Sequence, residues 1–166
     1  MPVSVVSPDP ALSGARLGGR AAPLRAAVRE ALALEGRRAG EVAVVLADDA
    51  RLRDLNRRWR GLDRTTDVLS FGYDEGGDAE VDGDIVVSLE RVRAQARRFR
   101  VGPGRELARV VVHGALHLAG LDHEAAGERR RMRAREDRVL RGLREAITEL
   151  DAALGTAAGA RAKRAG

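Results

Sequence analysis

The chain has 166 residues, enough for one domain with a hydrophobic core, and it contains no cysteine, which excludes disulfides and thiolate metal ligands. Its net charge of +5 is compatible with a polyanionic partner, although an arginine-rich composition explains the charge equally well. The longest apolar stretch, 107–121, is interrupted by Arg109 and two histidines and is too short to cross a bilayer. With no secretory signal pattern at the N-terminus, we expect a cytoplasmic protein without membrane contact.

Hydrophobic periodicity and helix-end signals divide the chain into short strands and longer helices. In chain order, the predicted elements are a strand at 3–6, a helix at 23–36, a strand at 41–48, a helix at 50–61, strands at 67–71 and 85–88, and helices at 89–100, 104–120 and 127–153. Strands come early and helices late, which predicts an α+β fold.

Two segments are expected to lie outside these elements. The stretch 73–84 is acidic and glycine-rich, so we predict a mobile loop there that repels phosphate groups and does not touch RNA, with Asp84 exempted because it adjoins the next strand. Residues 154–166 are small and basic and are predicted to form a disordered tail. The predicted organisation is therefore a single domain at 1–153 followed by this tail.

All three histidines of the chain, His113, His117 and His123, fall within eleven positions. On a helix, His113 and His117 lie on one face about 6 Å apart along the axis. Gly120 can adopt the left-handed conformation that ends a helix, so the chain can turn and bring His123 to the same place. Three neutral imidazoles leave a fourth position for water, which is typical of a catalytic zinc site, although nickel, cobalt and iron also accept imidazole.

The residue after the first histidine is Gly114. In an H-E-x-x-H protease this position carries the glutamate that acts as general base, so peptide hydrolysis of that kind is disfavoured, even though Asp122 or Glu124 could in principle replace it. Three neutral ligands would also leave the charge of the metal uncompensated, which suits an anionic phosphodiester better than a neutral amide.

Three stretches together resemble one family, the YbeY endoribonucleases, which are bacterial rRNA maturation factors. The stretches are "LNRRWRGLDRTTDVLSF" (Leu55–Phe71), "GDIVVS" (Gly83–Ser88) and "RELARVVVHGALHLAGLDHE" (Arg105–Glu124). The resemblance covers roughly residues 41–145, and its H-G-x-L-H-L-x-G-x-D-H pattern is very specific. Ala119 and Leu121 stand where a leucine and an aromatic residue are common, and both remain apolar.

The resemblance implies one zinc ion on His113, His117 and His123, and an α+β fold in which the metal-binding helix lies centrally against a small mixed four-stranded sheet, with about five helices. It implies cleavage of single-stranded RNA at the 3′ end of 16S rRNA, work in ribosome quality control on the small ribosomal subunit, and no DNA substrate. Arg60 matches the functional arginine of the family, and its guanidinium suits a phosphate contact. Two alternatives stay open: a zinc hydrolase of amide or peptide bonds, and a non-catalytic assembly factor.

Overall fold

The computed structural model describes residues 3–7, 21–73, 79–121 and 126–165. Their strands form one four-stranded sheet in the order β1-β2-β4-β3. The bounds are β1 (Val3–Val6), β2 (Arg38–Ala47), β3 (Val68–Gly72) and β4 (Glu80–Ser88). The first, second and fourth strands are parallel neighbours, whereas β3 pairs antiparallel with β4. The predicted α+β fold with a small mixed sheet is confirmed.

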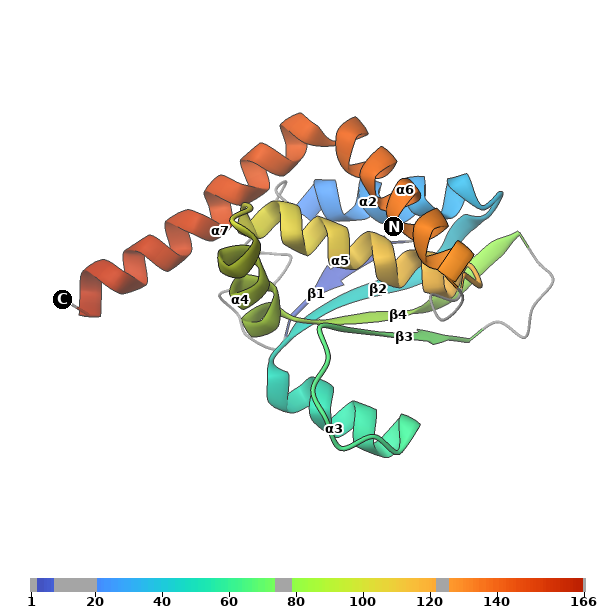
Figure 1. The fold of residues 1–166 in the computed structure, drawn as a ribbon, viewed down its shortest axis with the longest axis horizontal. Helices are drawn as coiled ribbons and strands as arrows, with labels where there is room; N and C mark the ends of the chain where they lie inside the picture. Colours follow the sequence, from blue (N-terminus) through green and yellow to red (C-terminus); the bar gives the residue numbers. More distant parts are fainter. Residues whose placement is uncertain (1–2, 8–20, 74–78, 122–125, 166) are drawn as a thin grey trace.

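The described ranges contain six helices, one more than the five expected. Their bounds are α2 (Ala22–Leu34), α3 (Asp49–Arg60), α4 (Leu89–Phe99), α5 (Pro103–Leu118), α6 (Ala126–Gly142) and α7 (Arg144–Ala165). Helices α2, α5, α6 and α7 lie on one side of the sheet and α3 lies on the other (Figure 1). Helix α5 packs against four other helices and two strands, so the histidine helix is central, as predicted. None of the described helices is long and apolar enough to span a membrane.

The two faces of β4 explain why helices cover both sides of the sheet. Ile85 and Val87 belong to the main core, which α2 and α5 cover, while Val86 between them belongs to a smaller cluster with Leu52 of α3. Successive side chains of a strand point to opposite faces, so an uninterrupted apolar run requires cover on both sides. The sheet therefore carries α5, with its histidines, on one face and α3, which ends at Arg60, on the other.

Helix α3, predicted at 50–61, has a capping residue at each end. The side chain of Asp48 accepts a hydrogen bond from the backbone N–H of Arg51 at 2.8 Å, which satisfies one of the unpaired donors of the first turn. Gly61 ends the helix with φ 68°, in the left-handed region that glycine adopts without strain. These two caps determine where Arg60 stands, at the last position of the helix.

The predicted loop at 73–84 is wrong in its second half. Strand β4 begins at Glu80, and its inward positions Val81 and Gly83 are buried while Asp82 and Asp84 alternate with them on the more exposed face. The side chain of Asp82 is hydrogen-bonded: its Oδ1 accepts from the backbone N–H of Glu41 at 2.6 Å. The acidic residues concealed the two-residue period of a half-exposed strand. Residues 74–78 lie outside the described part, so the prediction about RNA stays untested.

The single C-terminal helix predicted at 127–153 is in fact two helices, because the helix is interrupted at Leu143, between α6 and α7. Gly142, at the end of α6, weakens the helix there, and Leu143 turns into the core. The second helix continues to Ala165, through most of the stretch predicted as a tail. The division into a domain at 1–153 and a separate tail stays a prediction.

Candidate active site

Two imidazoles of α5 converge on one point. His113 and His117 lie one turn apart, their ring centroids are 4.7 Å apart with planes at 70°, and their Nε2 atoms are 3.1 Å apart. Two nitrogens bound to one tetrahedral zinc at about 2.0–2.1 Å would be separated by roughly 3.3–3.4 Å. The pair therefore fits a shared metal ion with a shift of only a few tenths of an ångström.

The third predicted ligand, His123, lies outside the described residues. What the structure does describe is the turn before it: Gly120 has φ 104°, and the backbone N–H groups of Gly120 and Leu121 donate back to His117 and Leu116 at 3.0 Å. This is the left-handed helix end predicted from the sequence. Among the described residues no group of three metal-binding side chains occurs, so the three-histidine site remains a prediction.

A carboxylate that was not predicted from the sequence contacts His113, one of the two histidines. Oε1 of Glu136, on α6, lies 2.8 Å from Nδ1 of His113. The Glu136 side chain is buried, and its Oε2 lies 3.9 Å from Nη1 of Arg109. The Nε of Arg109 in turn donates to Oε1 of the buried Glu106 at 2.9 Å. The consecutive helices α5 and α6 thus share one network of charged contacts.

The charges of the side chains in this network do not balance. Glu106 and Glu136 contribute two negative charges and Arg109 one positive charge, so the three side chains carry a surplus of one negative charge next to His113. Burial lowers the pKa of Arg109, but its hydrogen bond to Glu106 and the charges of Glu106 and Glu136 raise the pKa to above its ordinary value. The guanidinium is therefore firmly protonated. A cation on the far side of the imidazole would compensate the remaining negative charge.

The histidines open into a cleft of about 820 Å³ between α3, β3 and α5. Its lining comes from the end of α3, the segment that follows, β3 and the C-terminal half of α5, with one residue before β2. The lining residues are Arg37, Asn56, Arg60, Leu62, Arg64, Thr65, Thr66, Asp67, Val68, Leu69, Ser70, Gly72, His113, His117 and Leu118. The structure therefore brings Arg60 and two of the predicted metal ligands into one cleft.

The segment between α3 and β3 is tied to α3. Buried Asn56 donates through Nδ2 to the carbonyl of Arg64 at 2.9 Å, and Nε of Arg53 donates to Oδ1 of Asp63 at 2.8 Å. The hydrogen bond to Arg53 and the charge of Arg53 lower the pKa of Asp63, while the hydrogen bond to Asp63 and the charge of Asp63 raise the pKa of Arg53. These contacts give the cleft a fixed wall on the side of Arg60.

Arg60 is held rather than free. Its Nη2 donates to the carbonyl of Ser70 at 3.1 Å, and the guanidinium carbon lies 6.0 Å from the centre of the Phe71 ring. Ser70 also donates through Oγ to the carbonyl of Gly114 at 2.8 Å. One residue of β3 thus connects Arg60 to the turn of α5 that carries His113. Ser70 could not be identified from the sequence, because this link exists only in the folded chain.

Gly114 has a packing role. A Cβ atom added there would lie 2.6 Å from Cγ2 of Ile85 and 3.1 Å from Oγ of Ser70, both on the sheet. Contacts below 3.0 Å require something to move, and Ile85 is fully buried. The position faces the sheet, so a glutamate could not stand there without separating α5 from β3 and β4. The lack of space explains why a general base, which the sequence showed to be missing at this position, could not be accommodated here.

We expect Gly114→Ala to destabilise the fold by up to about 2 kcal/mol, because forcing a methyl group into a packed core costs about 1–3 kcal/mol and the better helix propensity of alanine offsets only about 1 kcal/mol of that cost. Thermal unfolding of the metal-free protein measures this. Gly127→Ala is the matched control, because Gly127 is also helical and has nothing within 4 Å of an added Cβ. Equal melting temperatures for the two variants would contradict the packing role.

Comparison with known proteins identifies relatives over most of the chain. The family model described as "Endoribonuclease YbeY" matches residues 21–144. Proteins of the same name are 44% identical over 133 residues in Anaeromyxobacter sp. (78% of this chain, 69% of the relative) and 44% identical over 124 residues in Pelotomaculum thermopropionicum (70% and 82%). A solution structure from Thermotoga maritima has a TM-score of 0.56 and 29% identity, over 86% of this chain and 92% of that one. The chain belongs to the YbeY endoribonuclease family.

Proposed function

We propose that this chain is a zinc-dependent endoribonuclease that cleaves single-stranded RNA in the cytoplasm, where it matures the 3′ end of 16S rRNA and acts in quality control on the small ribosomal subunit. Membership of the YbeY family supports an RNA-cleaving hydrolase. The observation that supports the metal-dependent chemistry is the pair of imidazoles, with Nε2 atoms 3.1 Å apart, in the same cleft as Arg60.

The residues present fit a zinc ion. His113 and His117 would hold it together with His123, and the surplus negative charge behind His113 suits a dication. When bound, zinc polarises an oxygen of its substrate and lowers the pKa of a water molecule toward neutrality. The sequence provides neither a thiolate nor a fourth histidine as a competing ligand.

Arg60 has the chemistry to bind and orient the phosphate group. Its guanidinium presents several N–H donors in a fixed plane, and within the described part of the chain a single hydrogen bond, from Nη2 to the carbonyl of Ser70, joins it to the backbone. The guanidinium carbon lies over the ring of Phe71, 6.0 Å from its centre. The remaining donors can therefore stabilise the charge that builds up on the phosphate oxygens during cleavage.

Nothing in the described residues favours amide hydrolysis in the manner of an H-E-x-x-H protease. The position that would carry the general base, Gly114, is closed by Ile85 and Ser70 and faces the sheet. A non-catalytic assembly factor would need the same fold and the same metal, so activity alone separates it from the enzyme.

The direct test uses one labelled RNA oligonucleotide, incubated with zinc-loaded protein either as a single strand or annealed to its complement. We expect internal cleavage of the single strand and none of the duplex. Equal cleavage of both would exclude single-strand specificity. Intact RNA in both samples, with the protein folded and zinc-loaded, would contradict the nuclease and favour the assembly factor.

A further inference from the structure

The Nδ1 atom of His113, which is the ring nitrogen not facing His117, has a carboxylate partner, Glu136. Nδ1 of His113 lies 2.8 Å from Oε1 of Glu136, which comes from another helix 23 residues later. A carboxylate can only accept hydrogen bonds, so the proton of the neutral imidazole belongs on Nδ1 and the lone pair on Nε2. It is Nε2 that points toward His117, at 3.1 Å.

Glu136 is itself fixed in place. It is only 4% exposed, although the other charged residues of its helix are exposed or half-buried, and its second oxygen lies 3.9 Å from Arg109. Arg109 stands on α5 one turn before His113, and its Nε donates to Glu106 at 2.9 Å. A buried carboxylate costs free energy unless it is paired, so this position of Glu136 requires partners on both of its oxygens. His113 and Arg109 are those partners.

We propose that Glu136 is a positioning residue for the metal site: it selects the Nδ1–H tautomer of His113 and aims Nε2 at the ion, while Arg109 holds Glu136 in the orientation that makes this possible. The inference rests on the zinc site of the proposed function. It goes beyond the ligands, because Glu136 would not touch the metal or the RNA.

Replacing the carboxylate should weaken metal binding more than it weakens the fold. We expect Glu136→Gln to lower zinc affinity by about 10–100-fold, the range typical for partners of ligating histidines. Competition with a chromophoric chelator measures the affinity. Asp137→Asn is the matched control: it removes the same charge from the neighbouring position of α6, where the side chain is exposed. Metal-free melting curves of both variants establish that the fold is kept.

The tautomer gives a readout that needs neither zinc nor activity. The chain has only three histidines, so a long-range ¹H–¹⁵N spectrum of the imidazole rings contains three patterns. In metal-free wild-type protein at mildly alkaline pH, we expect the ring of His113 to carry its proton on Nδ1. In Glu136→Gln we expect the Nε2–H form to become populated as well, because a neutral amide can donate to Nδ1 as readily as accept from it.

Two results would overturn the positioning role: a wild-type His113 protonated on Nε2, or a Glu136→Gln variant whose zinc affinity equals that of Asp137→Asn. Failure of the proposed function looks different, since wild-type protein would then bind no zinc. The tautomer of His113 in the metal-free protein would still show in that case whether Glu136 sets the protonation of this imidazole.

Discussion

Arg60→Ala is expected to lower the rate of RNA cleavage by about 10²–10³-fold, the usual effect of removing one donor to a transition state, while fold and zinc content are retained. Arg60 is exposed, and its contacts with the described residues are one hydrogen bond to Ser70 and the ring of Phe71, so its loss should cost little stability. Single-turnover cleavage, zinc content and thermal melting on the same preparation measure the three quantities. Arg60→Lys should recover only part of the rate, because an ammonium cannot make the two-pronged contact.

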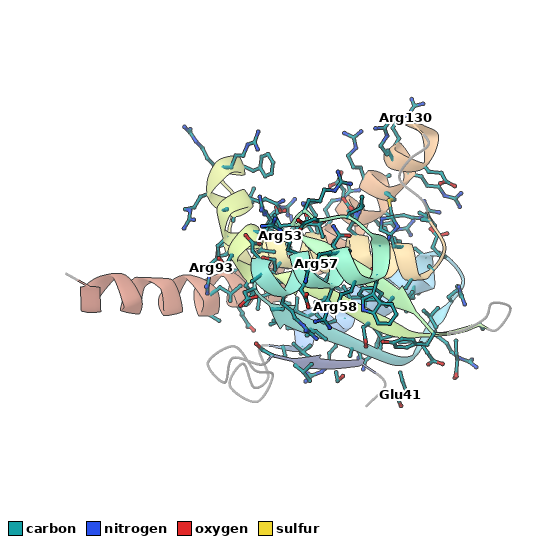
Figure 2. The ribbon with its side chains drawn as sticks, turned by 90° about the horizontal axis from the view of Figure 1, so that it is seen from below. Glu41, Arg53, Arg57, Arg58, Arg93 and Arg130 are labelled. Atoms are coloured by element: carbon teal, nitrogen blue, oxygen red, sulfur yellow. The ribbon has the colours of Figure 1, made fainter. Side chains whose placement is uncertain are left out.

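The same helix offers two control arginines. Arg57 and Arg58 both pair with Asp54, at 2.9 Å and 3.2 Å, and both are exposed. Figure 2, which views the molecule from the side of α3, shows these two side chains with that of Arg53 on this helix. Their alanine variants should change cleavage modestly and in a salt-dependent way. If all three arginine variants weaken cleavage equally and added salt removes the differences, Arg60 has no specific role.

His117→Ala is expected to abolish both zinc binding and cleavage. Its Nε2 is one side of the pair 3.1 Å apart, and two remaining ligands hold zinc poorly. The wild-type protein should melt at a higher temperature with zinc than with chelator. At a zinc concentration 100-fold above Kd, zinc binding should raise the free energy of unfolding by about 2.7 kcal/mol. The variant should show no such difference.

Arg105→Ala, an exposed position on the same helix, controls for the substitution itself and should keep the full zinc response. A His117→Ala variant that binds zinc with wild-type affinity would show that the proposed coordination is wrong.

Local features of the chain could be predicted because short-range chemistry determines them. The left-handed turn at Gly120 is where the sequence places it, and the helix predicted at 50–61 forms at Asp49–Arg60 between the capping residues Asp48 and Gly61. Each depends on one residue type with a specific backbone or hydrogen-bonding property. The start of β4 at Glu80 was missed because pairing with neighbouring strands, rather than local composition, makes a strand from acidic and glycine-rich residues.

In the candidate site, too, local features could be predicted from the sequence and contacts between helices could not. The histidine spacing predicts that His113 and His117 converge, but the partner of His113 comes from α6, and only tertiary packing brings it there. A signal for it was present. Glu136 follows Met132 by four residues and precedes Leu140 by four, so it occupies the apolar stripe of a helix that is otherwise highly charged. A carboxylate at such a position needs a buried partner.

The role of Gly114 could not be read from the sequence. Its position directly after His113 suggested that a general base is missing. Its contacts with Ile85 and Ser70, however, depend on how closely α5 approaches the sheet. Helix-to-sheet distance is a property of the whole core, and no local pattern records it.

The most direct test of the account is one preparation, purified without an affinity tag, assayed for zinc and for cleavage of single-stranded RNA before chelation, after EDTA and after zinc is restored. We expect one zinc per chain, no cleavage after EDTA, and recovery of both zinc and cleavage together. Full cleavage by protein that elemental analysis shows to be free of any transition metal would contradict it.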